Sequence, residues 1–140
     1  MIFSKRKQPE AINITDRILL KTIYDLYYEE FCSYNNKSKR SSKIYVPINC
    51  EEVAKNLKVD PDIVFGRLYH YLDKKFRHQD SDGTITHLFA LKVGDDRHAV
   101  NFPLLSAVVA DLEQSFVRFT IPLYLSIGAI LISFIALIYK

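Results

Sequence analysis

Cysteine and glycine are scarce in this sequence. Its two cysteines, Cys32 and Cys50, have neither the number nor the spacing of a disulfide framework or a zinc site. The chain contains no Gly-rich phosphate loop, no HExxH motif, no paired CxxC and no nucleophile elbow. These absences argue against an enzyme, and the missing disulfide framework favours a reduced, cytoplasmic soluble part.

A large excess of one charge is also missing. The chain has 19 basic and 16 acidic residues, so its net charge is +3, far from the strong basicity of a dedicated nucleic-acid binder. The spacing of the four histidines matches no known ligand pattern. His70, His78, His87 and His98 could gather around the hairpin, and His78, Asp80 and His87 could form a metal site there. We expect neither a metal nor another cofactor.

Charge is absent altogether from the last part of the chain. The 21 residues from Phe119 to Tyr139 are uncharged and mostly Ile, Leu, Phe and Ala. As a helix they would span roughly 30 Å, the thickness of the hydrocarbon core of a bilayer. A core helix of so small a domain would keep a polar face. Here only Thr120, Ser126 and Ser133 interrupt the apolar run, and their hydroxyls can bond to the backbone of their own helix.

The ends of this segment carry residues typical of membrane interfaces. Tyr124 and Tyr139 lie toward the two ends, with a basic residue outside each of them. Pro122 falls in the first turn, where a missing N–H costs little. We therefore assign residues 118–140 to a transmembrane helix; the alternative is a buried helix at an oligomer interface.

The distribution of basic residues predicts the orientation of this helix. Basic residues lie overwhelmingly on its N-terminal side, and only Lys140 follows it. By the positive-inside rule the soluble domain then lies in the cytoplasm. A chain built this way resembles tail-anchored, single-span membrane proteins.

Small residues recur along the apolar segment. They follow the spacing i, i+3, i+7 and i+10 and so form one stripe: Ser126, Ala129, Ser133 and Ala136. Small side chains let two membrane helices approach closely. We expect this stripe to pack against a second copy of the chain or against another membrane helix.

The beginning of the chain is polar. The segment MIFSKRKQPE has a basic cluster but no apolar run after it, so it is not a secretory signal peptide. We assign residues 1–13 to a flexible basic lead.

A helical pattern opens at Thr15 or Asp16, and either residue would cap it. Its apolar positions are Ile18, Leu19, Ile23, Leu26, Tyr27 and Phe31. The polar, basic run at residues 33–43 has no periodicity and predicts a loop. Residues 43–47 resemble a short strand.

The segment INCEEVAKNLKVDPDIVFGRLYHYLDKKF is the most informative part of the domain. Asn49, with Glu52 three residues later, resembles a capping box that opens a short helix. Asp60 can cap a second helix with Pro61 at its first position. Two helices joined by a tight turn form a helix-turn-helix.

The chain after the second helix alternates like a β-hairpin. SDG at residues 81–83 predicts a turn, and residues 84–93 predict a strand. One face of that strand would carry Ile85, His87, Phe89, Leu91 and Val93. Residues 94–97 would form the hairpin loop and residues 98–102 the partner strand. Pro103 would start a final helix that runs toward the apolar segment.

The order helix, short strand, helix, turn, helix and two-stranded hairpin resembles the winged-helix (winged helix-turn-helix) arrangement. The resemblance covers residues 14–117 and rests on this order and on the stretch EEVAKNLKVDPDIVFGRLYHYL. It implies an α+β fold with a C-terminal membrane helix. In the winged-helix class, the second helix of the motif usually enters the DNA major groove and the hairpin touches the backbone.

A basic and aromatic face on the second helix is the candidate partner site. Its residues are Arg67, Tyr71, Lys74, Lys75 and Arg77. Nucleic acid could bind there together with the basic loop at 37–43, but the acidic residues Asp60 and Asp62 at the leading end of the helix would repel phosphates.

A protein partner or self-assembly is the stronger expectation. Tyrosine is enriched at interfaces, and this domain is rich in it: Tyr24, Tyr27, Tyr28, Tyr34, Tyr69 and Tyr71. The alternative is that several of these tyrosines complete the core.

Three functions are consistent with the sequence. The leading hypothesis is a membrane-anchored winged-helix adaptor that recruits or assembles partners at the membrane, as an oligomer. The second is a membrane-tethered transcriptional regulator that binds DNA. The third is that the winged-helix domain is a dimerisation device within a larger complex. By its architecture alone, the chain also resembles small membrane-acting effectors of bacterial defence or stress systems.

Overall fold

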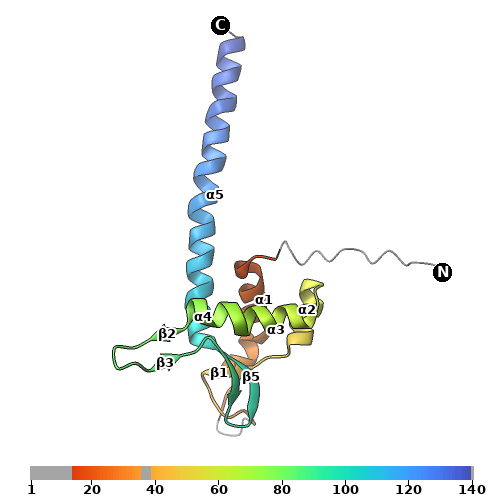
Figure 1. Cartoon of the computed structure of the whole chain (residues 1–140). Helices are drawn as coiled ribbons and strands as arrows, with labels where there is room; N and C mark the ends of the chain where they lie inside the picture. Colours follow the sequence, from red (N-terminus) through yellow and green to blue (C-terminus); the bar gives the residue numbers. More distant parts are fainter. Residues whose placement is uncertain (1–13, 36–38, 140) are drawn as a thin grey trace, which may run out of the picture. The chain divides into compact units, whose positions relative to one another are not determined.

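The computed structural model describes residues 14–35 and 39–139, and the predicted lead at 1–13 lies outside them. The protein has an α+β fold (Figure 1). Its elements follow in the order α1 (Asp16–Cys32), β1 (Tyr45–Pro47), α2 (Cys50–Leu57), α3 (Pro61–Gly66), the π-helix η2 (Arg67–Leu72), α4 (Asp73–Phe76), β2 (His78–Gln79), β3 (Ile85–Thr86), β4 (Phe89–Val93), β5 (Asp96–Asn101) and α5 (Phe102–Ile138). The chain divides into two compact units between Val109 and Ala110, inside α5, and each unit is described by itself.

Helix α1 begins where the sequence predicts. The Thr15 hydroxyl caps it by accepting a hydrogen bond from the N–H of Ile18 (3.2 Å). Its buried face consists of Leu19, Leu20, Ile23 and Tyr27. The predicted face was too wide, because Ile18 and Leu26 each stay more than a third exposed.

Helix α2 has the predicted cap, but half of the capping box is made differently. Oδ1 of Asn49 accepts from the N–H groups of Glu51 (2.8 Å) and Glu52 (3.4 Å). The Glu52 carboxylate accepts instead from the Tyr27 hydroxyl (2.7 Å), which itself accepts from the N–H of Asn49 (2.9 Å). The tyrosine thus occupies the place that the glutamate would have in a reciprocal box. Burial, then the bond to Glu52, raises the pKa of Tyr27 above its usual range.

The second helix of the predicted motif is present but not regular. Asp60 caps α3 by accepting from the N–H of Asp62 (2.9 Å), with Pro61 at the first position. The helix then continues through the π-helical segment η2 into α4. A π-helical turn takes in an extra residue, so the side chains after it are rotated relative to those of a regular α-helix.

Strands β1, β5 and β4 form one antiparallel sheet in that order, and β2 and β3 form a separate two-stranded sheet. The predicted single strand at 84–93 is therefore two strands. Leu88 and Phe89, on either side of the start of β4, are both buried. The predicted face was wrong in consequence, since Ile85 and Leu91 are 40% and 41% exposed.

The turn between β4 and β5 contains two residues, Gly94 and Asp95, which is shorter than the predicted loop. Gly94 has φ +58°, and a Cβ there would lie 2.6 Å from the Ser41 side chain. Ser41 also accepts from the N–H of Asp95 (3.1 Å) and donates its own N–H to Asp96. The tip of this hairpin is therefore packed against the segment before β1.

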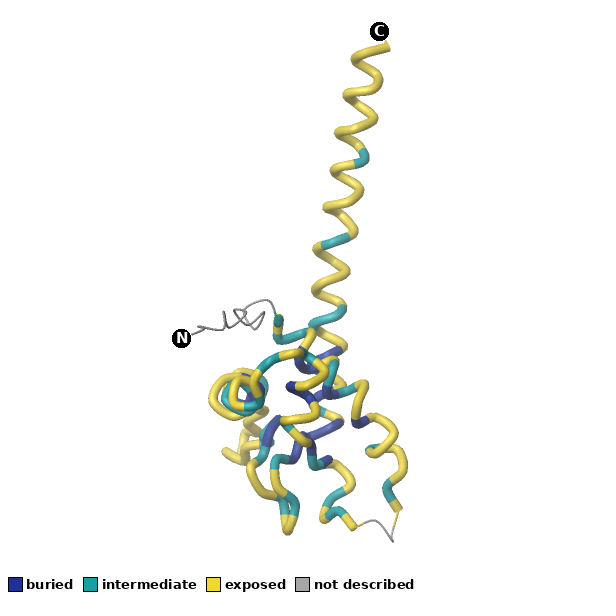
Figure 2. Tube along the Cα trace, turned by 90° about the vertical axis from the view of Figure 1, so that its right-hand side faces the viewer, coloured by how far each residue is buried: buried dark blue, intermediate teal, exposed yellow. Residues whose placement is uncertain are grey.

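The first residues of α5 complete the core of the domain. Asn101 accepts from the N–H of Leu104 (3.1 Å) and so supports the start of the helix. The buried residues of α5 are Phe102, Leu105, Val108 and Val109. Figure 2 shows buried residues gathered in the domain, whereas the trace of α5 beyond them is almost entirely exposed.

Candidate functional sites: an apolar helix and a basic pocket

The second unit of the chain begins at Ala110 and contains the apolar part of α5. Among the described residues, α5 is the one helix long and apolar enough to cross a membrane, and none of its most apolar stretch is buried. Its large apolar side chains between Phe119 and Tyr139 are 47% to 88% exposed. The chain therefore has an α+β domain and a C-terminal helix suited to a bilayer.

The polar residues of this helix are satisfied within it, as the sequence predicts. The hydroxyls of Thr120, Ser126 and Ser133 donate to the carbonyls of Phe116 (2.7 Å), Pro122 (2.8 Å) and Ala129 (2.9 Å). Such bonds remove the penalty of placing a hydroxyl in hydrocarbon. They also leave the stripe of Ser126, Ala129, Ser133 and Ala136 without a hydroxyl that needs a partner; its packing role stays a prediction.

Pro122 lies differently from the prediction. It is an interior residue of α5, because the helix already begins at Phe102. The missing N–H therefore deprives the carbonyl of Arg118 of its usual helical donor.

The predicted basic face on the second helix of the motif is divided in two. Arg67 donates to the Asp16 carboxylate (2.7 Å) and to the carbonyl of Ile14 (2.6 Å). Lys75 donates to the other oxygen of Asp16 (2.8 Å) and lies beside the Tyr71 ring. We call Arg67, Tyr71 and Lys75 the tethered row, because its two cations hold the start of α1.

The charge of Asp16 is stabilised by this arrangement. Burial by itself would raise the pKa of Asp16, but the hydrogen bonds from Lys75 and Arg67 outweigh it and hold the pKa below its ordinary value. The same bond raises the pKa of Lys75. The tethered row is thus engaged inside the domain rather than free for a partner.

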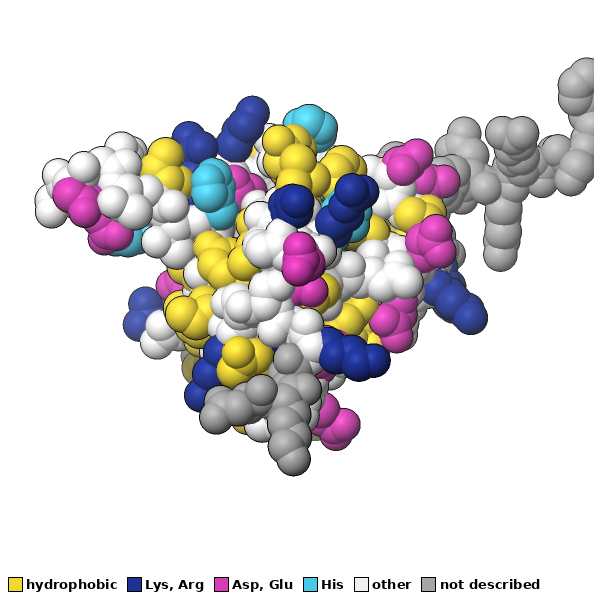
Figure 3. Space-filling model, turned by 90° about the horizontal axis from the view of Figure 1, so that it is seen from below, with side chains coloured by type: hydrophobic (Ala, Val, Ile, Leu, Met, Phe, Trp, Pro, Cys, Tyr) yellow, Lys and Arg dark blue, Asp and Glu magenta, His cyan; other side chains and the backbone are white. Residues whose placement is uncertain are grey.

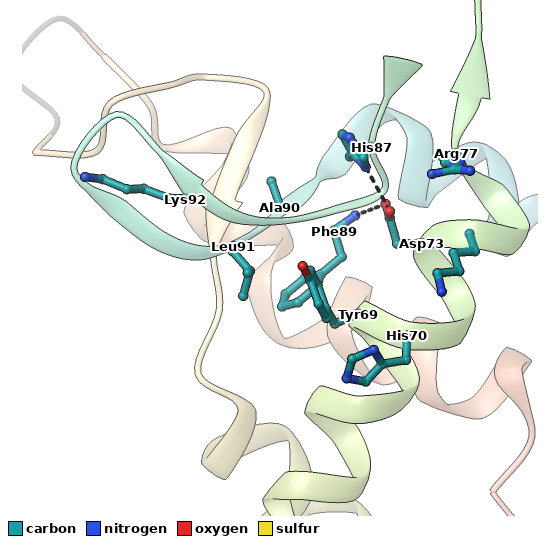
Figure 4. A pocket seen from close by; sticks show the side chains of 10 residues that line it. Tyr69, His70, Asp73, Arg77, His87, Phe89, Ala90, Leu91 and Lys92 are labelled. Carbon is teal, nitrogen blue, oxygen red and sulfur yellow. Dashed lines mark hydrogen bonds and ion pairs between the residues drawn. The ribbon is translucent and has the colours of Figure 1, made fainter.

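Lys74 and Arg77 belong to a different surface. They line a cavity of about 580 Å³ between the η2–α4 helix and β4 (Figure 4). We call it the basic pocket, and its lining residues are Tyr69, His70, Asp73, Lys74, Arg77, His87, Phe89, Ala90, Leu91 and Lys92.

The floor of the basic pocket is a buried carboxylate. Asp73 is 5% exposed; its Oδ1 accepts from the N–H of Phe89 (3.1 Å), and its Oδ2 accepts from Nδ1 of His87 (2.8 Å). An ionised carboxylate only accepts hydrogen bonds, so with Asp73 ionised Nδ1 of His87 is the donor of this bond. Asp73 thus joins α4 to His87 in the segment before β4 and to Phe89 at the start of β4, and it leaves Nε2 of His87 outside these bonds (Figure 4).

The cations of the basic pocket lack acidic partners. Within residues 14–35 and 39–139, no ion pair joins Lys74, Arg77 or Lys92 to a carboxylate. The side chain of Lys92 points away from Asp73 in Figure 4, so this lysine lies at the margin. The site therefore has more positive than negative charge, and its one carboxylate is already used.

Sequence reasoning missed most of this site, because only Lys74 and Arg77 of its lining residues belonged to the predicted face. Among the residues that it missed, His70 and Asp73 lie on the same helix as the predicted face, whereas His87 and Lys92 come from a later part of the chain. One signal was available: Asp73 follows Tyr69 by four residues and Leu72 by one, which places an acid on the apolar side of the helix.

The other sequence-predicted groups lie elsewhere. His78 pairs with Asp80 (3.2 Å) whereas His87 bonds to Asp73, and the described residues contain no group of three or more His, Cys, Asp or Glu suited to a metal. In the basic loop, Arg40 donates to the carbonyls of Glu30 and Phe31 at the end of α1. Residues 37 and 38 of that loop lie outside the described residues.

The tyrosines are divided between core and surface. Tyr27 is buried, Tyr24 stacks on Phe102, and Tyr34 lies under the Arg40 guanidinium. Tyr28 and Tyr71 are 47% and 51% exposed. The space-filling view in Figure 3 shows Lys, Arg and His side chains interspersed with hydrophobic ones rather than one continuous basic surface.

No family model, curated protein or solved structure matches this chain. By its own residues it is an α+β protein with a C-terminal helix, α5, that is long and apolar enough to span a membrane. Its function is inferred from the two sites described above.

Proposed function

We propose that the chain is a membrane-anchored binding module whose domain recruits or assembles protein partners at a bilayer. The observation that carries this proposal is the contrast in α5. Its first residues are buried in the core of the domain, whereas its large side chains from Phe119 onward are exposed and apolar. So much contiguous apolar surface is unfavourable in water and favourable in hydrocarbon.

The proposed orientation places the domain in the cytoplasm. Basic residues are concentrated before the apolar segment, with Arg118 directly at its start. Basic residues near a span favour the cytoplasmic side.

We further propose that the domain is a winged helix. Two features support this: the order α1, β1, α2, α3 and hairpin, and the position of β1 in the same sheet as the β4–β5 hairpin. The β2–β3 hairpin between α4 and β4 would then be an addition to the basic arrangement.

A protein partner is favoured over nucleic acid by contacts inside the domain. Arg67 and Lys75 are held by Asp16, and the tip of the β4–β5 hairpin is packed on Ser41. A winged helix on DNA uses this helix and this hairpin, so both would first have to be released. Exposed Tyr28 and Tyr71 suit a protein interface instead.

Membrane fractionation of cells that express the full chain tests the anchor. We expect the protein in the membrane fraction, resistant to alkaline carbonate. Gly128→Arg should shift it to the soluble or aggregated fraction, since a central arginine costs about 2.5–3.5 kcal/mol on insertion. Gly128→Leu, at the same position, should stay in the membrane. Extraction of the wild-type chain by carbonate would overturn the proposal.

The native cysteines test the orientation. Cys32 is exposed, whereas burial raises the pKa of Cys50 and lowers its reactivity. A membrane-impermeant maleimide should label the protein only after cells are opened, and Cys32→Ser should remove most of that labelling. Labelling of Cys32 in intact cells would place the domain outside.

Recruitment needs a separate measurement. Crosslinking in cells, followed by purification in detergent, should recover a second copy of the chain or the same partner in repeated preparations, and Tyr71→Ala plus Tyr28→Ala should weaken that recovery. A monomer without any reproducible partner would overturn the adaptor role while leaving the anchor intact.

A further inference from the structure

We propose that the basic pocket binds a small phosphate-bearing ligand, with Lys74, Arg77 and His87 holding the phosphate and Tyr69 beside the rest of the molecule. This site goes beyond the proposed function and does not depend on it. The same phosphate monoester chemistry could come from a soluble metabolite or from a lipid headgroup.

Charge is the first argument. Lys74, Arg77 and Lys92 line the cavity with no acidic partner among residues 14–35 and 39–139, and the one carboxylate there is buried and bonded. Like charges gathered at a concave surface repel one another and raise the local positive potential. A dianion in the cavity reverses that repulsion, and a phosphate monoester is a dianion near neutral pH.

The donor groups suit a tetrahedral oxyanion. The Arg77 guanidinium is a planar fork that can bond two phosphate oxygens at once, and a lysine adds a mobile point charge. Figure 4 shows His87 and Arg77 on either side of Asp73. Since Asp73 holds Nδ1 of His87, the imidazole has a fixed orientation, and its Nε2 is not used in that bond.

The size and the apolar wall argue for a ligand larger than inorganic phosphate. Small-molecule sites are typically about 300–1,000 Å³, and this cavity is about 580 Å³. Tyr69 lies near Phe89, with ring centroids 6.5 Å apart, and both Tyr69 and Leu91 keep more than a third of their surface exposed. A planar or apolar group attached to the phosphate would cover this surface.

The local backbone is a further, independent feature. Tyr69 and His70 belong to the π-helical segment η2. Such segments are rare and occur frequently at functional sites, because they change the direction of side chains on an otherwise regular helix. In this helix the segment directly precedes Asp73, Lys74 and Arg77.

Phenyl phosphate is the probe, since it joins a phosphate monoester to a flat apolar ring. The full chain in neutral detergent micelles would be titrated and followed by its amide NMR spectrum. We expect saturable shifts at residues of the basic pocket, with a Kd of about 1 mM or tighter. Benzoate, which has the ring and a carboxylate, should bind at least about tenfold more weakly because it offers one negative charge.

Matched variants distinguish binding in the basic pocket from nonspecific attraction to positive charge. Lys74→Ala and Arg77→Ala should each weaken phenyl phosphate at least about tenfold. Arg77→Lys should fall between Arg77→Ala and the wild type, since it keeps the charge and loses the fork. Lys55→Ala removes one exposed cation from α2, outside the pocket, and should change nothing.

The source of the phosphate is separated by lipid composition. The full chain in phosphatidylcholine nanodiscs, with or without phosphatidic acid, would be titrated in the same way. Pocket shifts with phosphatidic acid alone would assign a headgroup ligand, and shifts with phenyl phosphate in plain discs a soluble one. Absence of saturable shifts with both probes would overturn the proposal, as would an equal loss of affinity in Lys55→Ala.

Discussion

Two groups of cations on and directly after one helix differ in whether a carboxylate pairs with them. In the tethered row, Arg67 and Lys75 share the carboxylate of Asp16. In the basic pocket, Lys74 and Arg77 make no ion pair with the part of the chain that the structure describes. Lys74 and Lys75 are neighbours in sequence, yet one holds the domain together and the other faces a cavity. Position along this segment therefore separates the cations that are held by Asp16 from those that line the basic pocket.

Asp73→Ala should have the largest effect on stability, because it removes the link between α4 and β4. The change leaves the buried N–H of Phe89 without its acceptor and frees His87. We expect the free energy of unfolding to fall by about 2–4 kcal/mol. Urea unfolding of the full chain in micelles, followed by circular dichroism, measures it.

Asp73→Asn is the control for this change. It keeps one carbonyl acceptor for the N–H of Phe89 and should lose clearly less stability than Asp73→Ala. Equal losses in the two variants would mean that the charge of Asp73, and not its hydrogen bonds, is what the domain requires.

Asp16→Asn should loosen the tethered row and leave the basic pocket intact. The Asp16 side chain is 18% exposed and bonds both cations, so we expect a loss of about 1–2 kcal/mol at pH 7. The pKa of Asp16 is lowered in the folded state, so this stability is present above the unfolded pKa, near about 4, and is lost as pH falls through the folded pKa. The difference between variant and wild type should therefore shrink below about pH 4.

Unfolding curves of Asp16→Asn and the wild type between pH 3 and 8 give this profile. A difference that stays constant across this range would show that the Asp16 charge adds no stability. Phenyl phosphate binding at pH 7 serves as the control and should be unchanged.

The smallest effects are expected for the two neighbouring lysines, Lys74 and Lys75, which belong to different sites. Lys75 is 42% exposed, so solvent screening limits its ion pair, and Lys75→Ala should cost only about 0.5 kcal/mol. Lys74→Ala should leave stability unchanged and weaken phenyl phosphate, whereas Lys75→Ala should do the reverse. The two rows would not be distinct if both variants changed both quantities alike.

Much of the local structure could be predicted from sequence. The caps Thr15, Asn49 and Asp60 lie where their residue types indicate, since a cap depends on a few neighbouring residues. The break at His87 and Leu88 could not be predicted, because alternation alone does not say which residues meet the core. Glu52 matched the capping-box pattern, but its carboxylate accepts a hydrogen bond from the hydroxyl of Tyr27, which lies 25 positions away in sequence.

The candidate sites divide in the same way. The apolar segment is a property of consecutive residues, so its suitability for a bilayer follows from composition and length. The surroundings of the basic face, in contrast, do not follow from consecutive residues. Its members were predicted as one surface, and the fold distributed them between Asp16 and the basic pocket.

The sequence by itself determined the capped helices, the small α+β domain and the apolar segment from Phe119 to Tyr139, because each depends on short-range pattern. Only the tertiary structure decided which cations are paired. Asp16 lies 51 and 59 positions from Arg67 and Lys75, and Asp73 meets His87 across 14. The order of charged residues along a chain does not specify which of them pair. Packing of α1 against the helix with the π-helical turn brought Arg67 and Lys75 within 3 Å of Asp16. Packing of β4 against the same segment left Lys74 and Arg77 facing a cavity.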